Sequence, residues 1–333
     1  MRFIASQTQQ RIRIVALAAS LANARDLGEW LGCPPHAIFN FPTSVGPVLL
    51  ETNVQSFTIS HQASLMLAMV KPTYTAICAA AGKPAIVFVP SRKQTRLTAT
   101  ELMAYVLADI DGDAPSPLLH CDVSALEPYL EKLSDRTLHE CLRVGIGYYH
   151  EAMTPAEKQV IEKLFNMGAI QVAVASRETA WGIPLTSQLV VLSGTQYFDG
   201  SEHRYVDYPI AEVLHMIGRA TRPMIDDASR CLLLCSSAKK DLYKKFLFEG
   251  LPLESHLHLV LHDHFNAEIV TKTIENKQDA VDYLTWTFLY RRITQNPNYY
   301  GLQGVTNRHI SDHLSELVEV RAPLLIMFIF FLY

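Results

Sequence analysis

The sequence contains no apolar run long enough to cross a bilayer and no excess of positive charge. Its most membrane-like stretch, residues 323–333, is far shorter than the roughly 20 residues that a spanning helix needs. Charged residues make up 19% of the 333 residues and the formal net charge is -4, which excludes a generically basic nucleic-acid coat. Any contact with RNA must therefore come from a local groove. Hydrophobic residues make up 49%, which is enough apolar material for more than one core.

Cysteine is also sparse. Six cysteines in a chain of this length, with no signal peptide in residues 1–10, predict a reducing compartment and free thiols instead of disulfides. Cys231 and Cys235 are the one close pair, and three leucines separate them in a strand-like run. This context favours packing in a core over a role as metal ligands.

Four histidines lie near one another in the sequence, namely His256, His258, His262 and His264. A spacing of four residues would place His258 and His262 on one face of a helix, as zinc ligands sometimes lie. The helical metalloprotease pattern requires a glutamate beside the first histidine, and Leu259 stands there instead. Capping and core roles are therefore favoured, and we predict no metal site.

Short apolar runs rich in β-formers alternate with longer segments of helical period, which is typical of a mainly parallel sheet covered by helices. The expected strands are 12–17, 48–55, 85–89, 147–149, 170–175, 189–192 and 230–235. The expected helices are 23–31, 61–80, 94–108, 135–144, 154–167 and 209–219. The sequence therefore predicts an α/β fold.

After Cys235 the pattern becomes helical. Ala280, Leu284 and Phe288 repeat at four-residue spacing and form one broad apolar stripe, which aromatic residues flank. Core positions of a small helical domain are favoured for them over a platform that stacks nucleobases. The stretch 307–319 is amphipathic, and we expect the almost wholly apolar residues 320–333 to be an aberrant tail.

The strongest chemical signal is segment 215–223, which reads H-M-I-G-R-A-T-R-P and follows a predicted helix. Arg219 and Arg222 lie three residues apart near the end of that helix and are expected to project to one side. A guanidinium is the group best suited to stabilise charge on a transferring phosphate. On this segment alone, an arginine finger and a surface pair of arginines both remain open.

The neighbouring segments decide between these alternatives. Segment 215–223 resembles the last conserved motif, Q-M-x-G-R-A-G-R-P, of the DExH-box superfamily-two RNA helicases of the Ski-two-like group. Upstream segments resemble other parts of this family in the same order: 14–23 motif three, 85–95 motif four, 145–150 the stretch after it and 174–183 motif five. Ordered matches over about 200 residues exclude coincidence.

The resemblance implies a role for particular residues at the two ligands of the family, RNA and ATP. It implies RNA binding by Ser91, Arg92 and Ser176, lobe coupling by Ser20, and nucleotide binding by Gly182, Arg219 and Arg222, the two arginines forming the catalytic arginine-finger segment. Magnesium would accompany ATP and would be held by the first lobe of the helicase, which this chain lacks.

Residues 263–317 narrow the resemblance to the second helicase cassette of the large spliceosomal members, where this stretch forms a winged helix. A RecA-like parallel sheet flanked by helices and a mostly helical winged-helix domain are therefore expected. The implied domains are 1–45, the end of a first RecA-like lobe and a linker; 46–250, the second lobe; 251–319, an incomplete winged helix; and 320–333, the tail. Small nuclear RNA, spliceosomal proteins and a nuclear location are implied, with no membrane partner.

The sequence also departs from the family pattern. His215 stands where the family has a glutamine with a paired amide donor and acceptor, and Thr221 replaces a glycine. Pro184 follows Ile183 directly, where active members carry Asn or Asp. No G-x-x-x-x-G-K-[ST] loop and no D-E-x-H box occur, so we predict that this chain alone does not hydrolyse ATP.

Three hypotheses follow. The chain is a piece of an ATP-dependent spliceosomal helicase that unwinds small nuclear RNA duplexes, or a non-catalytic pseudo-helicase module that binds splicing proteins and regulates an active cassette. The third is that it has no function of its own, because an incomplete helical domain would expose apolar residues.

Overall fold

The computed structural model describes residues 13–42, 45–110, 114–250, 252–302, 304 and 306–321. The chain divides into two compact units, one formed by residues 43–249 and the other by residues 1–42 together with 250–333. The apolar tail lies almost wholly outside the described residues. Among the described helices, none combines the length and the apolar character that crossing a membrane requires.

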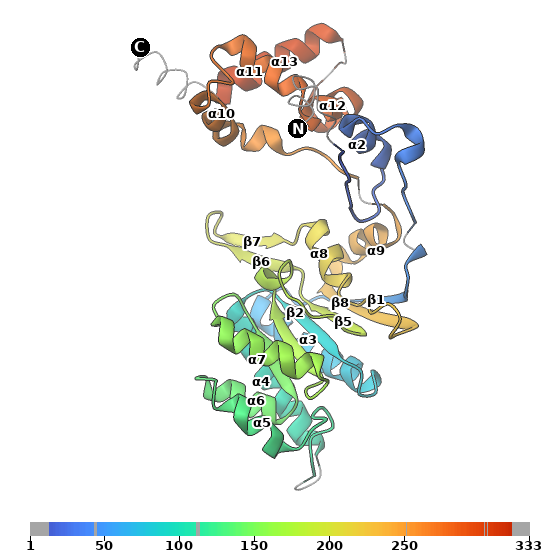
Figure 1. The fold of residues 1–333 in the computed structure, drawn as a ribbon, viewed down its shortest axis with the longest axis vertical. Helices are drawn as coiled ribbons and strands as arrows, with labels where there is room; N and C mark the ends of the chain where they lie inside the picture. The colour runs from blue at the N-terminus through green and yellow to red at the C-terminus, as the bar shows by residue number, and fades with distance from the viewer. Residues whose placement is uncertain are drawn as a thin grey trace. The chain divides into compact units, whose positions relative to one another are not determined.

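The larger unit is built on a parallel sheet, which has six strands in the described part of the chain (Figure 1). Its strands are β1 (Leu49–Phe57), β2 (Ala85–Val89), β3 (Ile146–Tyr149), β4 (Val172–Ser176), β5 (Leu189–Ser193) and β8 (Ala228–Ser236). They lie in the order β1-β8-β5-β2-β4-β3. β2, β4 and β5 are buried along their whole length, which explains why their sequences are continuous apolar runs.

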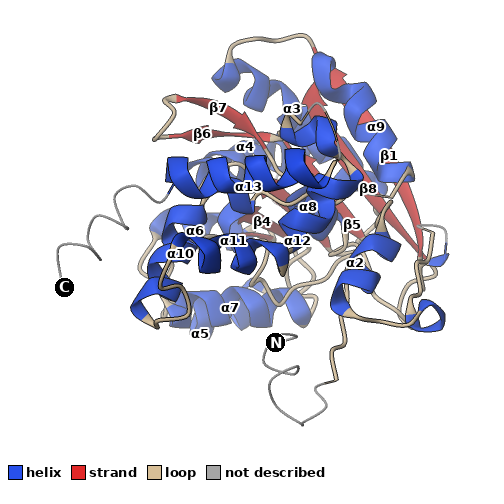
Figure 2. Ribbon diagram, turned by 90° about the horizontal axis from the view of Figure 1, so that it is seen from above, coloured by secondary structure: helices blue, strands red, loops and turns tan. Residues whose placement is uncertain are grey.

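Helices flank this sheet (Figure 2). They are α3 (Gln62–Ala79), α4 (Arg92–Asp109), α5 (Val123–Leu130), α6 (Arg136–Arg143), α7 (Pro155–Asn166), α8 (Ile210–Ile217) and α9 (Lys240–Phe248). Local signals fix several of their starts. Thr154 and Glu157 form a capping box at α7, and the hydroxyl of Ser91 accepts a hydrogen bond from the backbone N–H of Gln94 at α4.

A small antiparallel hairpin leaves the sheet after β5 and was not expected from the sequence. Its strands are β6 (Gln196–Asp199) and β7 (Arg204–Asp207). Gly194, at the turn into the hairpin, has φ +92°, and a Cβ there would lie 3.2 Å from the sulfur of Met66. Glycine is therefore suited to both the backbone conformation and the close approach of this turn.

The smaller unit is helical in its described part. It contains α2 (Ala24–Leu31), α10 (Leu261–Val270), α11 (Lys277–Thr285), α12 (Phe288–Gln295) and α13 (Asn307–Arg321). Its core is formed by apolar side chains of α10 to α13 and the segments between them, among them Leu261, Phe265, Leu284, Leu289, Ile293 and Leu314. This burial confirms the interpretation as core for Ala280 and Leu284 of the stripe, whereas Phe288 is only partly buried and contacts Trp30.

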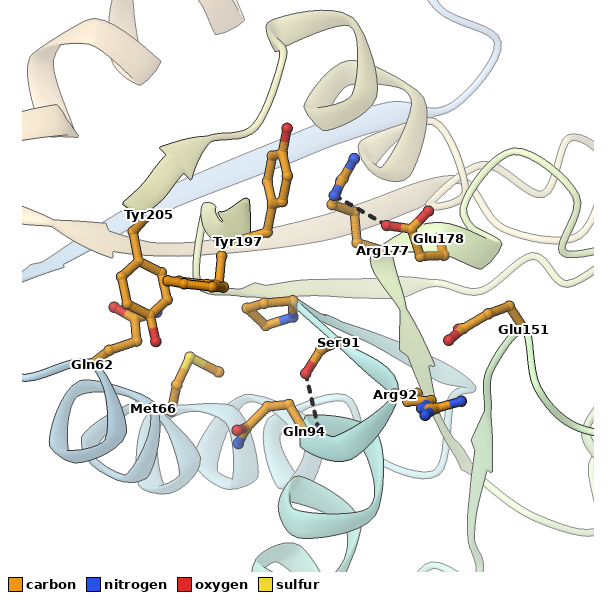
Figure 3. Close-up of a pocket in the computed structure, with 12 residues that line it drawn as sticks. Gln62, Met66, Ser91, Arg92, Gln94, Glu151, Arg177, Glu178, Tyr197 and Tyr205 are labelled. Atoms are coloured by element: carbon orange, nitrogen blue, oxygen red, sulfur yellow. Dashed lines mark hydrogen bonds and ion pairs between the residues drawn. The ribbon is translucent and has the colours of Figure 1, made fainter. Parts of the chain in front are cut away.

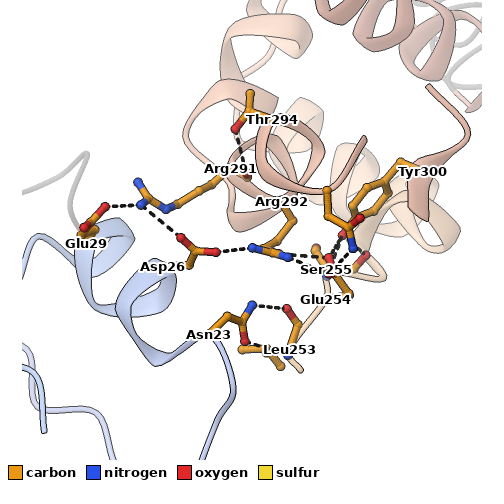
Figure 4. A network of polar contacts seen from close by, with 11 residues as sticks. Asn23, Asp26, Glu29, Leu253, Glu254, Ser255, Arg291, Arg292, Thr294 and Tyr300 are labelled. Atoms are coloured by element: carbon orange, nitrogen blue, oxygen red, sulfur yellow. Dashed lines mark hydrogen bonds and ion pairs between the residues drawn. The ribbon is translucent and has the colours of Figure 1, made fainter. Parts of the chain in front are cut away.

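Ion pairs attach α2 to α12 in this unit (Figure 4). The buried guanidinium of Arg292 contacts the carboxylates of Asp26 and Glu254, and Arg291 contacts Asp26 and Glu29. Because Arg292 has two carboxylate partners, its charge is compensated inside the unit. Residues of segment 1–45, which was predicted to be the end of a first lobe and a linker, thus pack with residues of segment 251–319, which was predicted to be the winged helix.

One expected strand was wrong: residues 13–17, within the expected strand 12–17, are not a strand. The apolar stripe is divided between two helices, because α11 ends at Thr285 and α12 begins at Phe288. The shared helical face that was considered for His258 and His262, and not favoured, does not form, since a short 3₁₀ turn (Leu257–Leu259) precedes α10. The expectation of free thiols is confirmed for all six cysteines, and Cys231 and Cys235 are buried in β8.

Candidate functional site

A cleft of about 390 Å³ opens where β2 and β4 end in the larger unit, and we call it the strand-end cleft (Figure 3). Ligands of parallel α/β sheets bind at the carboxyl ends of the strands, where loops bring side chains together. The cleft is lined by side chains from α3, the start of α4, the turn after β4 and the hairpin: Gln62, Met66, Pro90, Ser91, Arg92, Gln94, Glu151, Arg177, Glu178, Tyr197, Phe198 and Tyr205.

Ser91 and Arg92, two of the residues predicted to bind RNA, lie in this cleft at the amino end of α4. Ser91 caps the helix, and Arg92 is its first residue and is exposed. Among the described residues, no carboxylate lies within ion-pair distance of Arg92. A helix start with an adjacent uncompensated guanidinium is an environment that favours a phosphate.

Ser176, the third predicted RNA contact, is fully buried at the end of β4 and does not line the cleft. Its hydroxyl donates a hydrogen bond of 2.9 Å to the carboxylate of Glu151, which does line it. In this structure Ser176 therefore holds another residue of the cleft and offers no surface to a ligand.

The opposite wall of the cleft is aromatic and was missed by sequence reasoning. Phe198 and Tyr205 face each other across the hairpin with ring centroids 5.5 Å apart, and both rings are about half exposed. Tyr197, the preceding residue of β6, also lines the cleft, and its ring projects to the other side of the hairpin, toward Arg177 (Figure 3). The sequence signal that could have revealed this wall is a set of aromatic residues among charged and polar neighbours. Aromatic rings in such a stretch are expected at the surface, where they can contact a ligand.

Arg219 lies in the turn after α8 and is bound to its own lobe. Its guanidinium donates a 3.1 Å hydrogen bond to the carbonyl of Ala180 and lies 3.2 Å from Nε2 of His215. The indole of Trp181 stacks on the His215 ring, with centroids 4.0 Å apart. Burial, then the charge of Arg219, lowers the pKa of His215, so the neutral ring accepts a hydrogen bond from that guanidinium.

Gly182, the predicted nucleotide contact, directly follows Trp181 and is exposed. The structure thus brings Gly182 and Arg219 into one neighbourhood, since Arg219 also approaches the carbonyl of Trp181 at 3.5 Å. Arg222 is bound elsewhere. It pairs with the buried carboxylate of Asp226, which also receives Lys83 at 3.7 Å.

Ser20, the predicted lobe-coupling residue, belongs to the smaller unit. Its hydroxyl lies 3.5 Å from the side-chain oxygen of Asn40, and the Asn40 amide donates a 2.6 Å hydrogen bond to the carbonyl of Leu21. These contacts stabilise the local loop of the smaller unit. Among the described residues, no group of three or more His, Cys, Asp and Glu side chains is arranged to hold a metal ion.

A parallel sheet with a cleft at its strand ends and arginines in the turn after α8 defines the larger unit as a RecA-like α/β lobe. The adjoining sequence matches a family model for winged helix-turn-helix domains over residues 254–326. The fold is therefore a RecA-like lobe followed by a winged-helix domain.

Comparison with curated proteins identifies the relatives of this chain. It is 58% identical over 320 residues to the U5 small nuclear ribonucleoprotein 200 kDa helicase of Homo sapiens and 55% identical to that of Drosophila melanogaster. It is 54% identical over 321 residues to the ATP-dependent RNA helicase DExH12 of Arabidopsis thaliana. These matches cover 96% of this chain, which spans about 15% of the length of each relative. The chain is a homologue of these DExH-box RNA helicases.

Proposed function

We propose that this chain acts as the second RecA-like lobe and the winged-helix part of an ATP-dependent spliceosomal RNA helicase. Its ligand would be small nuclear RNA, its partners other spliceosomal proteins, and its location the nucleus. The domain limits that we propose are 46–250 for the lobe and 251–319 for the winged helix. Ser20 would contribute to coupling between the two lobes.

The observation that carries this proposal is the strand-end cleft. It presents the start of α4 and the exposed guanidinium of Arg92 on one side, and the exposed rings of Phe198 and Tyr205 on the other. Cations and helix starts bind phosphates, and aromatic rings stack on bases, so the two walls suit the two parts of a single-stranded RNA. Ser176 contributes by holding Glu151.

Binding of labelled single-stranded RNA, followed by fluorescence anisotropy at several salt concentrations, tests the cleft. We expect Arg92→Ala to weaken binding about tenfold and to reduce the slope of log affinity against log salt by about 0.7, the value for one phosphate contact. Arg143→Ala is the matched control, because Arg143 is an exposed arginine of α6 that pairs with Glu127 outside the cleft. Equal loss in both variants, or in neither, would refute the assignment.

For nucleotide, we propose that Gly182, Arg219 and Arg222 face ATP when a first lobe supplies the phosphate loop and the magnesium ligands. The chain alone is then inactive as an ATPase. An ATPase assay on this chain and on a longer chain that includes the first lobe tests the proposal. Turnover by the short chain would contradict it, and turnover by the longer chain that Arg219→Ala abolishes would support it.

One observation favours a second candidate, the non-catalytic module that binds splicing proteins and regulates an active cassette. Arg219 is bound to the Ala180 carbonyl and to His215, and Arg222 is bound to Asp226, so both guanidinium groups are engaged inside the lobe. Absence of turnover in the longer chain, together with retained binding of partner proteins, would favour this function.

A further inference from the structure

Arg177 is a largely buried arginine between the strand-end cleft and helix α8. It is the first residue after β4, and its side chain is 14% exposed. Its Nε donates a 2.7 Å hydrogen bond to Glu212, and its Nη1 lies 3.1 Å from the carboxylate of Glu178. Its guanidinium also lies over the ring of Tyr197, with the central carbon 3.7 Å from the ring centroid.

Each partner of Arg177 belongs to a different element. Tyr197 is part of β6, which is one strand of the hairpin that forms the aromatic wall of the cleft. Glu212 is in the first turn of α8, the helix that leads to the turn with Arg219. Figure 3 shows Arg177 between Tyr197 and Glu178 at the edge of the cleft. One guanidinium thus contacts the hairpin, the helix and the turn after β4.

We propose that Arg177 is a positioning residue that fixes the β6–β7 hairpin to helix α8, so that the cleft wall and the arginine-bearing turn are held in one arrangement. The consequence for RNA rests on the function proposed above, whereas the joint between hairpin and helix does not. The chemistry requires arginine, because a planar guanidinium can stack on a ring and donate in its plane to two carboxylates at once.

Lysine cannot replace it in this geometry. The ammonium of Arg177→Lys keeps the charge near Glu212 but has no plane to lay over Tyr197. Each contact of the joint can therefore be weakened by its own substitution. Glu212→Gln weakens the helix half and Tyr197→Leu removes the hairpin half, and neither residue carries the phosphate-facing groups Ser91 and Arg92.

Hydrogen–deuterium exchange of the intact chain, resolved by segment, tests the joint without RNA. For Arg177→Lys we expect exchange about tenfold faster in both 196–207 and 210–217, because the ring contact with Tyr197 and the simultaneous donation to two carboxylates are lost, and unchanged exchange in the core strand 146–149. Glu212→Gln and Tyr197→Leu should each accelerate both segments. The matched control is Arg143→Lys, which should change none of the three.

Two results would overturn the proposal. One is acceleration of the hairpin alone or of α8 alone, because the two elements would then not be joined through Arg177. The other is no acceleration, or equal acceleration in 146–149, which would reduce Arg177 to an ordinary contributor to stability. RNA affinity is a separate readout: weaker binding of Arg177→Lys with an unchanged salt slope is expected. Failure of the unchanged chain to bind RNA would refute the cleft assignment but leave the joint intact.

Discussion

Arg92 and Arg219 belong to the same lobe, and family resemblance assigns both to a phosphate, but the structure holds them in opposite ways. Arg92 is exposed at a helix start, without a carboxylate in ion-pair distance among the described residues. Arg219 is hydrogen-bonded to the Ala180 carbonyl and to His215, whose ring stacks on that of Trp181. The cleft side of the lobe is open to a ligand, whereas the arginine segment is bound to its own lobe.

This difference separates groups that contribute to stability from groups that are available for binding. A guanidinium with protein partners on its donors stabilises the fold, and removing such a partner leaves a charge without compensation. A guanidinium in solvent contributes little to the fold and is free to contact an anion. Substitutions in the arginine segment should therefore change stability first, and substitutions in the cleft should change binding first.

The largest expected effect is that of Asp226→Ala. Asp226 is buried and pairs with Arg222, whose side chain is mostly buried as well, so the substitution leaves a buried cation without its partner. We expect the free energy of unfolding, measured by urea denaturation, to fall by about 3 kcal/mol. Arg92→Ala should change it by no more than about 0.5 kcal/mol. Similar losses in the two variants would break the contrast between the regions.

Two exposed aromatic residues provide an intermediate test. Trp181→Ala removes the ring that stacks on His215 and should cost about 1 kcal/mol of unfolding free energy, with RNA affinity unchanged. Phe198→Ala removes one exposed ring of the cleft wall and should cost at most about half as much, while it weakens RNA binding about tenfold. Urea denaturation and anisotropy give both quantities, and the reverse pattern would contradict the assignment of the two regions.

The sequence predicted best those strands of the sheet that are buried on both faces, because such strands consist of apolar residues. β2, β4 and β5 are apolar because both of their faces are covered, and helices with clear caps, such as α7, follow their signals. The hairpin was missed because its strands are short and only partly buried, so no alternating pattern marks them. The run 12–17 was misread as a strand because apolar character alone does not supply a partner strand; its described residues, 13–17, form none.

The candidate site was predictable only in part, for a similar reason. Ser91 and Arg92 were predicted from the resemblance of segment 85–95 to a family motif, and the structure places both in the cleft. The burial of Ser176 and the engagement of Arg177 with Tyr197 depend on which elements meet in space. A single sequence marks Arg177 only as a charge beside a strand. Its stacking on the hairpin is a tertiary contact between residues 20 positions apart in the chain, and no local pattern encodes it.

The smallest expected effect is the pH dependence that His215 contributes. Burial, followed by the charge of Arg219, lowers the pKa of His215 in the folded chain below its ordinary value of 6.5. As the pH falls through about 6.5, the unfolded chain therefore takes up this proton first, and stability that is complete above that pH is lost below it. Burial lowers the pKa of His150 and His313 in the same direction, so His215→Gln removes one contribution among several. We expect the fall in Tm between about pH 7.5 and about pH 5.5 to be smaller in this variant than in the unchanged chain. An identical fall would show that His215 titrates alike in both states and is not held as a neutral acceptor for Arg219.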